Sequence, residues 1–490
     1  MTTSSHITAG DGAPTPVETD GAPELADIRR FGRHLVSRFV AQARKADART
    51  FRSLVGEHLG SAVDELPVVQ ETWPDYEHVN VQAALDAWAA RPGRAQDIIG
   101  IANFRHRELG LADLLAQAHH DPYSPMPGNV TRVSLAVGPD GETRDCLRAA
   151  IVLLTDGDDR LALFFRGPER ESDQRGTTLE IVGTDHATAR AVGQELRRLT
   201  LELNAFRGQV VSFGRSVFGE RASILRFHHR PQVSGDDLIL PASTFDDVRR
   251  QVIGVARNRD RLRAAGQHLK RGVLLYGPPG VGKTHTVRYL VSQLADTTII
   301  ELTGETLGGI REACSIARSL QPSMIVVEDV DLIAQQRDHY SGETPLLFTL
   351  LNEMDGLVED ADVVFLLTTN RADLLEPALA SRPGRVDQAV HIDVPDRAAR
   401  RRLIDLYRGR LRLDGSRLDD VLDRTDGVTA SFLKELLRRA AVIAADRDPD
   451  DEGELAVSGD DLTQALDDLL DTRNQLTRAV LGFERPATSE

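Results

Sequence analysis

Hydrophobic residues in the first quarter of the chain recur every three or four positions. Leu25, Ile28 and Leu35 show this spacing, which places them on one face of a helix. The residues before them are polar and rich in Gly, Pro, Ser and Thr, as is typical of a disordered tail. We therefore predict a disordered tail over residues 1–23, followed by a mostly helical accessory region over residues 24–122.

From about residue 123 the pattern changes to an alternation of apolar and polar positions. Short apolar runs separated by Gly- and Asp-rich turns occur at residues 131–137, 147–154, 161–165 and 178–183. They are typical of a small sheet. A helical pattern with Val192 and Leu196 on one face comes next, and two strand-like runs follow at 208–213 and 223–227. We assign residues 123–235 to an α+β accessory domain.

Beyond residue 240 apolar runs alternate with helical patterns. The strand-like runs lie at residues 272–277, 297–302, 323–329 and 362–370. This alternation predicts a parallel sheet covered by helices. A mainly helical segment follows, in which Phe432, Leu433 and Leu436 share one face. The predicted fold class is α/β, with a sheet subdomain at 236–394 and a helical lid at 395–480 before a flexible tail at 481–490, preceded by the helical and the α+β accessory regions.

Composition and charge restrict where the protein works and what it binds. The chain has 490 residues, 41% hydrophobic and 27% charged, which suggests several ordinary globular domains. No apolar run approaches the ~18 residues that span a bilayer, and the N-terminus does not resemble a signal peptide. We therefore expect a cytoplasmic protein without membrane insertion. The net charge of -16 disfavours nucleic acid as a partner.

A glycine-rich loop lies between the strand-like run at residues 272–277 and a helical pattern. Its sequence, GPPGVGKT at residues 277–284, has the spacing of a phosphate-binding loop. Backbone N–H groups of such a loop bind phosphates, Lys283 reaches the outer phosphates and the Thr284 hydroxyl binds Mg²⁺. ATP and Mg²⁺ are the predicted cofactors. The predicted nucleotide-binding residues here are Gly277, Pro278, Pro279, Gly280, Val281, Gly282, Lys283, Thr284 and His285.

Two adjacent carboxylates, Glu328 and Asp329, end the apolar run that begins at residue 323. An ionised pair at the end of a buried strand requires a compensating cation or partner, and Mg²⁺ with ATP supplies one. We assign Glu328 to the coordination sphere of the metal through water, and Asp329 to polarising the attacking water. The strand-like run at 362–370 ends in Asn370, whose amide can hydrogen-bond the water or the γ-phosphate.

With these motifs in place, the chain resembles the AAA family of ATPases within the AAA+ superfamily, in the branch with a second region of homology. It looks like a bacterial-type member with a single nucleotide cassette and an N-terminal accessory region. Beyond the phosphate loop and the acidic pair, the resemblance is carried by residues 245–248 (FDDV), 350–357 (LLNEMDGL), 368–387 (TTNRADLLEPALASRPGRVD) and 425–441 (TDGVTASFLKELLRRAA). It covers about 240 to 475.

The resemblance implies several roles for individual residues. Asp247 would lie on the adenine side of the nucleotide. Arg382 and Arg385 would act as arginine fingers, projecting from one subunit into the nucleotide site of the next. The resemblance then implies that an active enzyme is a homo-oligomeric, hexameric ring. The order Glu328 then Asp329 resembles that of some membrane-anchored mitochondrial members, and we interpret it as a tolerated variant that still hydrolyses ATP.

Three hypotheses for the cellular role remain open. The first is a chaperone-like ring that remodels or disassembles a protein client or adaptor recruited by the N-terminal region. The second is a nucleotide-gated assembly or switch ATPase that does not thread its client, and the third is a role linked to nucleic acid. Family members that thread polypeptides use an aromatic pore loop, whereas residues 301–318 contain no aromatic residue. Leu307 is the bulky apolar candidate for gripping a client in that loop.

Overall fold

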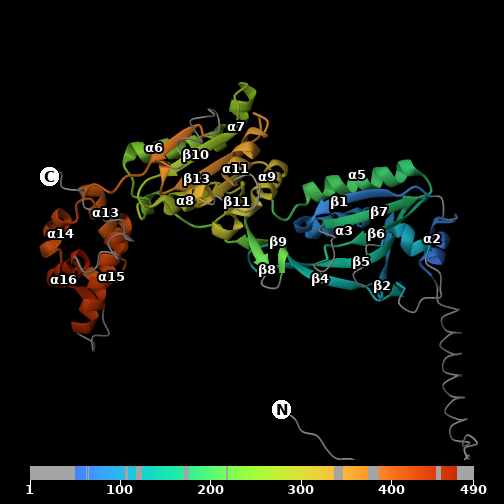
Figure 1. Cartoon of the computed structure of the whole chain (residues 1–490), viewed down its shortest axis with the longest axis horizontal. Helices are drawn as coiled ribbons and strands as arrows, with labels where there is room; N and C mark the ends of the chain where they lie inside the picture. Colours follow the sequence, from blue (N-terminus) through green and yellow to red (C-terminus); the bar gives the residue numbers. More distant parts are fainter. Residues whose placement is uncertain are drawn as a thin grey trace, which may run out of the picture.

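A computed structural model describes three groups of elements that follow one another along the chain (Figure 1). The described residues are 50–61, 63, 66–104, 109–116, 124–169, 176–216, 219–335, 346–373, 386–447 and 454–471. An accessory domain comes first, a subdomain built on a parallel sheet lies in the middle, and a group of helices follows at the C-terminal side.

The accessory domain is built on an antiparallel sheet. Its strand order is β1-β7-β6-β5-β2-β3, and β4 also pairs with β5. The long strand β5 has an apolar run at residues 149–154, and it pairs with both β2 and β4 because it is long enough to pair with each in turn. The strands are β1 (Val69–Pro74), β2 (Arg94–Ala102), β3 (Met126–Gly128), β4 (Thr131–Ala136), β5 (Thr143–Asp156), β6 (Asp159–Arg166) and β7 (Gly176–Gly183).

Helices cover both faces of this sheet. On one face α3 (His78–Ala89) and α5 (His186–Glu202) bury apolar side chains around Trp88. On the other face α2 (Phe51–Leu59) and α4 (Leu111–Ala116) pack around Phe164. Alternate residues of the sheet face the two cores, as a pleated strand requires.

The prediction that residues 24–122 are mostly helical is wrong for two segments of the described part. Residues 69–74 and 94–102 form β1 and β2. In β1 exposure alternates from residue to residue, and the strand pairs with β7. The N-terminal tail and residues 24–49 lie outside the described residues.

The middle subdomain is a parallel sheet with helices on both faces, as predicted. Its strand order is β14-β10-β13-β12-β11-β8-β9, in which β9 alone runs antiparallel to its neighbour. The strands are β10 (Arg271–Tyr276), β11 (Thr298–Leu302), β12 (Ser323–Val327), β13 (Val363–Thr369), β14 (Gln388–His391), β8 (Val210–Ser216) and β9 (Gly219–His228). The covering helices are α6 (Ala242–Arg249), the π-helical turn η3 (Arg250–Gly254), α7 (Val255–Ala264), α8 (Lys283–Ser292), α9 (Ile310–Ser319), α10 (Val330–Gln335) and α11 (Leu346–Asp355).

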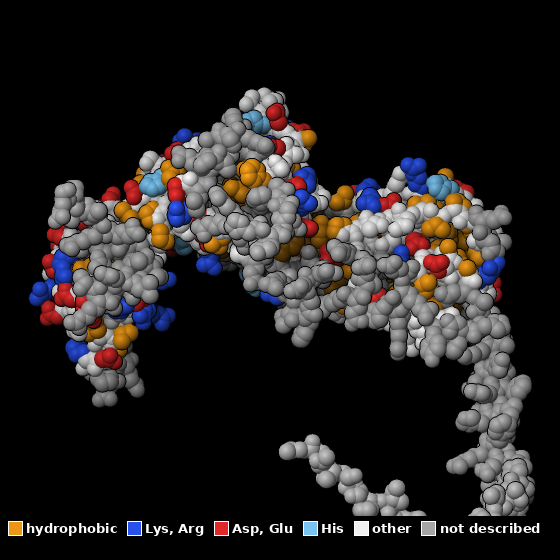
Figure 2. All heavy atoms as spheres, viewed as in Figure 1, with side chains coloured by type: hydrophobic (Ala, Val, Ile, Leu, Met, Phe, Trp, Pro, Cys, Tyr) orange, Lys and Arg blue, Asp and Glu red, His pale blue; other side chains and the backbone are white. Residues whose placement is uncertain are grey.

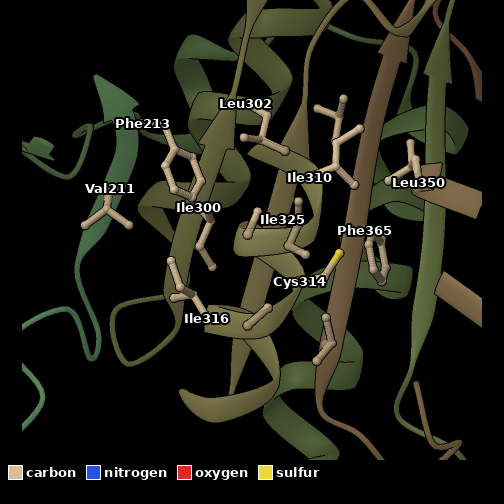
Figure 3. Close-up of a cluster of buried hydrophobic side chains, with 14 of the residues drawn as sticks. Val211, Phe213, Ile300, Leu302, Ile310, Cys314, Ile316, Ile325, Leu350 and Phe365 are labelled. Atoms are coloured by element: carbon tan, nitrogen blue, oxygen red, sulfur yellow. The ribbon is translucent and has the colours of Figure 1, made fainter. Parts of the chain in front are cut away.

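Strands β8 and β9 extend this sheet, which corrects the predicted position of residues 208–228 in the accessory domain. Val210 and Val211 of β8 lie in parallel register with Ile299 and Ile300 of β11. Figure 3 shows Val211 and Phe213 beside Ile300 in the apolar core under the sheet. The boundary at 235 therefore does not separate the two sheets, because strand pairing joins residues about 90 positions apart.

The accessory domain shares a core with the sheet subdomain. Tyr76 and Val79 of the accessory domain belong to the same buried cluster as Phe213 and Ile316. The short helix η1 (Asp75–Glu77) lies against β9. Burial raises the pKa of Tyr76 to about 12, and the nearby Ser315 on α9 opposes this shift. The two domains are thus joined by packed side chains as well as by the chain itself.

The C-terminal helices form a separate small core, consistent with the predicted lid. The elements are α13 (Arg397–Tyr407), η5 (Gly415–Arg417), α14 (Leu418–Arg424), α15 (Ala430–Arg447), α16 (Gly459–Leu470) and the pair of short strands β15 (Arg412–Leu413) and β16 (Ala456–Val457). Phe432, Leu433 and Leu436 of α15 lie in this core, as the helical spacing predicts. Charged side chains of both signs cover its outer surface (Figure 2). Within the described ranges, none of the helices combines the length and apolar character that crossing a membrane requires.

Candidate nucleotide site

The predicted phosphate loop connects β10 to α8 at the carboxyl end of the parallel sheet. Strand β10 is buried and lies between β14 and β13, so it fixes where the loop begins. A Cβ atom at Gly277 would lie 2.1 Å from the carbonyl oxygen of Ile392, so glycine is required there. Gly282 precedes the first residue of α8, Lys283. The start of α8 and the loop N–H groups therefore form a site suited to an anion.

Lys283 is buried and points back into the loop. Its side chain is 8% exposed, and Nζ donates hydrogen bonds to the carbonyl oxygens of Gly277 and Pro278, both at 2.9 Å. A third hydrogen bond runs from Nζ to Oδ1 of Asn370 at 2.7 Å. Burial lowers the pKa of Lys283, and the nearby carboxylate of Asp329 opposes this shift. The ammonium group is thus held in place at the mouth of the loop.

Glu328 and Thr284 bring oxygen atoms together across the gap between β12 and α8. Oγ1 of Thr284 donates a hydrogen bond to Oε2 of Glu328 at 2.9 Å. Burial raises the pKa of Glu328, and the hydrogen bond from Thr284 together with the charge of Arg288 opposes this shift. Hydroxyl and carboxylate oxygens are the hard ligands that Mg²⁺ prefers, so the two residues fit the predicted metal site.

Asp329 follows β12 in a left-handed backbone conformation. Its φ angle is 53°, a region in which Asp and Asn are enriched among non-glycine residues. Its N–H donates a hydrogen bond to Oγ1 of Thr368 at 3.1 Å. Oδ1 of Asp329 accepts a hydrogen bond from Nδ2 of Asn370 at 3.3 Å. The structure therefore brings Lys283, Asn370 and Asp329 into one connected group.

The helical lid contacts the phosphate loop directly. The N–H of Ser431 donates a hydrogen bond to the carbonyl oxygen of Gly280 at 3.1 Å. Gly280 has a φ of +81°, and a Cβ at this position would lie 2.9 Å from Oγ of Ser431 and 3.1 Å from Oγ1 of Thr429. On the other side of the loop, Nε2 of His285 lies 3.1 Å from the carbonyl oxygen of Asp237. Ile239, two residues later, packs against the lid core.

The other predicted site residues have different outcomes. Asp247 is exposed on α6, and its predicted contact with adenine stays a prediction. Pro279 is exposed and Val281 is buried in the core below the loop. Arg382 and Arg385, the predicted arginine fingers, lie outside the described residues.

The expectation for Leu307 is wrong. Its side chain is 4% exposed and belongs to the core under the sheet. The segment Gly304–Gly309 forms a short 3₁₀ helix, in which the Thr303 and Thr306 side chains bond each other's backbone. A Cβ at Gly309 would lie 3.3 Å from the ring of Phe213, so the segment packs closely on β8. Leu307 is unavailable for gripping a client because it fills this core.

Two polar residues at this end of the sheet, Asp331 and Thr368, were not predicted from the sequence. Asp331 is 7% exposed, and its Oδ1 accepts a hydrogen bond from Oγ1 of Thr369 at 2.8 Å. Thr368 binds the N–H of Asp329, as described above. The sequence feature that could have indicated them is the pair of threonines before Asn370 in an otherwise apolar strand, together with the acid Asp331 two residues after Asp329.

Comparison with known proteins supports the resemblance to AAA ATPases that the sequence motifs indicate. Residues 273–394 match the family described as "ATPase family associated with various cellular activities (AAA)". The chain is 35% identical over 245 residues to ATP-dependent zinc metalloprotease FtsH 2 of Sphaerobacter thermophilus, which covers 46% of this chain and 37% of that protein. It is 29% identical over 318 residues to ATP-dependent zinc metalloprotease FtsH of Mycobacterium leprae, covering 60% of this chain and 39% of that protein.

The chain thus spans less than half the length of these curated relatives. Among the described residues, no group of three or more His, Cys, Asp or Glu side chains is arranged to hold a metal ion. The family match covers the part of the chain in which the phosphate loop, the acidic strand end and Asn370 come together. Residues 273–394 of this chain thus form an ATPase domain of the AAA type.

Proposed function

We propose that the chain hydrolyses ATP in a Mg²⁺-dependent reaction and uses it to change how its accessory domain holds a protein partner. The observation that carries the proposal is the connected group of Lys283, Asn370 and Asp329 at the mouth of the phosphate loop. It combines a buried cation for phosphate, an amide and a carboxylate within hydrogen-bond distance of one another. These are the groups that phosphoryl transfer to water requires.

Each residue has a distinct task in this proposal. The loop N–H groups and Lys283 bind the phosphates, and Thr284 with Glu328 hold Mg²⁺, directly or through water. When bound, the metal supplies positive charge that neutralises the phosphate oxygens. Asp329 accepts the proton of the attacking water, and Asn370 orients that water. The segment around Ile239, between the core and the lid, is the proposed site for the adenine base.

The proposed active form is a ring of identical subunits, in keeping with the general behaviour of AAA ATPases. Its number of subunits, which we propose to be six, and the roles of Arg382 and Arg385 follow from the family resemblance alone. Sedimentation of the full chain with Mg²⁺-ATP tests the ring. Arg382→Ala and Arg385→Ala should each lower kcat while ATP binding is retained, because an arginine finger stabilises charge that develops only in the transition state.

The packing of residues 303–309 supports a machine that does not thread its client. Leu307 lies in the core and Gly309 packs on Phe213, so this segment is anchored to β8 of its own chain. The same core contains Tyr76 of the accessory domain. We therefore favour nucleotide-dependent control of a partner bound by the accessory domain over extrusion of a polypeptide past this loop.

Two measurements on the full chain test this function. Purified protein with Mg²⁺-ATP should release phosphate, and both EDTA and Lys283→Ala should stop the release. Asp329→Asn should keep ATP bound and retain a protein partner that the wild-type chain releases after hydrolysis. A wild-type chain that binds ATP and does not hydrolyse it contradicts the proposal, and turnover stimulated only by DNA would favour the nucleic-acid role instead.

A further inference from the structure

Asp331 is a buried carboxylate that the proposed hydrolysis does not use directly. It lies in the first turn of α10, two residues after Asp329, and is 7% exposed. Oδ1 accepts hydrogen bonds from Oγ1 of Thr369 at 2.8 Å and from the N–H of Asn370 at 3.2 Å. A buried carboxylate is costly unless its oxygens have donors, so these two bonds determine where the carboxylate lies.

Both donors lie at the carboxyl end of β13: Thr369 is its last residue, and Asn370 follows directly. Thr369 is itself fully buried, and its Oγ1 also accepts the N–H of Arg371 at 2.9 Å. Asp331 therefore fixes the backbone on each side of Asn370. Because its backbone is fixed, the Asn370 side chain is held where its oxygen accepts a hydrogen bond from Lys283 and its nitrogen donates one to Asp329.

A second hydrogen bond ties the same strand end to the acidic pair. Thr368 is 1% exposed, and its Oγ1 accepts the N–H of Asp329, the residue with the left-handed φ. The chain segment from Asp329 to Asp331 and the strand end from Thr368 to Asn370 are thus joined at both ends. A shift of either segment would move the carboxylate of Asp329 relative to Asn370.

We infer that Asp331 is a positioning residue: it sets the place of Asn370, and through Asn370 the distance between Lys283 and Asp329. This inference rests on the proposed ATP hydrolysis, because it assigns Asp331 to the alignment of the groups that carry out that reaction. The hydrogen bonds of Asp331 run to Thr369 and Asn370, and the proposed binding of phosphate and Mg²⁺ does not use it. Its removal should therefore slow the chemical step and leave ATP binding intact, since binding depends mainly on the loop and Lys283.

Variants of the full chain separate this role from a general role in folding. Asp331→Ala removes the acceptor, whereas Asp331→Asn keeps an oxygen that can accept both hydrogen bonds. Asp362 provides a matched control because it is also 7% exposed and lies at the other end of β13, near Arg259. The measured quantities are the Kd of a fluorescent ATP analogue, kcat and KM for Mg²⁺-ATP, and amide hydrogen exchange at residues 368–371.

Asp331→Ala should lower kcat by about 10- to 100-fold, the cost of a misplacement of about 1 Å, and change Kd by less than about threefold. Asp331→Asn should recover most of the lost kcat, and Asp362→Asn should behave as wild type. Amide exchange at residues 368–371 should rise in Asp331→Ala and stay near the wild-type rate in Asp331→Asn. Unchanged kcat and exchange in Asp331→Ala, or an equal loss of binding and turnover, would overturn the inference.

The failure of the proposed function looks different from the failure of this inference. If the wild-type chain binds ATP and never hydrolyses it, the proposed function is wrong. The exchange measurement needs no turnover, and it still decides whether Asp331 holds the strand end at Asn370. If the wild-type chain is active and Asp331→Asn loses as much kcat as Asp331→Ala, then the hydrogen-bond acceptor is not what matters and the positioning role is wrong.

Discussion

Oδ1 of Asn370 accepts a hydrogen bond from Nζ of Lys283 at 2.7 Å, which links the end of β13 to the phosphate loop after β10. These strands are neighbours in the sheet, and their carboxyl ends meet at the same edge. The link orients a buried ammonium group toward the place where phosphates would bind. The same amide contacts Asp329 on its other side, so Asn370 connects the binding group with the hydrolytic one.

Lys283→Ala should weaken ATP binding by about 10- to 100-fold, because hydrogen bonds to a charged group contribute about 1.5–3 kcal/mol. The Kd of a fluorescent ATP analogue measures the effect. Lys434→Ala is the control, since Lys434 lies on the lid with its Nζ 5.9 Å from the ring centre of Tyr407. Equal Kd values for wild type and Lys283→Ala would contradict the assignment of the loop.

Exchanging the order of the two acids should reduce turnover. Asp329 has a φ of 53°, and Asp adopts this left-handed region more readily than Glu does. The double variant Glu328→Asp, Asp329→Glu should therefore lower kcat, by up to about 100-fold if the carboxylate shifts by about 1 Å. ATP binding should stay within a few-fold of wild type.

Steady-state phosphate release and the Kd of the ATP analogue check this prediction together. The control is the single variant Asp360→Glu, in the exposed turn before β13, which should leave both quantities unchanged. A double variant that turns over as fast as wild type, or faster, would show that the backbone at Asp329 does not favour the native order.

The local part of the site was predictable, whereas its surroundings were not. Loop spacing identified Lys283, and the ends of apolar runs identified Glu328 and Asn370, because these features depend on a few consecutive residues. The place of β8 depends on pairing of Val210 with Ile299, far away in the sequence, and no local pattern encodes that partner. Burial of Leu307 depends in turn on the core that β8 helps to form.

Gly280→Ala should disturb the contact between the phosphate loop and the lid. The new Cβ would lie 2.9 Å from Oγ of Ser431 and would sit on a backbone with a φ of +81°. The loop or the lid must move, so ATP binding should weaken by about tenfold or more if the strain is about 1–3 kcal/mol. Titration with the ATP analogue measures the change.

Gly308→Ala is a matched control for the glycine substitution. A Cβ at Gly308 would meet no atom within 4 Å, so its effect on ATP binding should be negligible. If Gly280→Ala binds ATP as wild type does, the lid contact is too adaptable to matter. A Gly308→Ala variant with weakened binding would point to a general sensitivity of the domain instead.

Tyr76→Phe should loosen the junction between the accessory domain and α9. The buried hydroxyl of Tyr76 lies near Ser315 of α9, and the loss of this polar group should cost about 1 kcal/mol at this junction. Amide exchange across α9 should then rise several-fold. Tyr407→Phe, a half-buried tyrosine of the lid, is the control and should leave α9 unchanged. Identical exchange in α9 for Tyr76→Phe and wild type would argue against coupling through this contact.

Leu307→Ala should destabilise the sheet subdomain rather than remove a grip on a client. The side chain is 4% exposed in a packed core, and truncation of such a leucine typically costs about 2–5 kcal/mol. Leu332→Ala is the control, because Leu332 is 46% exposed and its truncation should change stability by less than about 0.5 kcal/mol. Calorimetry of the full chain should show a lowered transition for Leu307→Ala alone. If that variant instead melts as wild type does and loses only the remodelling of a partner, Leu307 acts on the client, and the threading hypothesis regains its support.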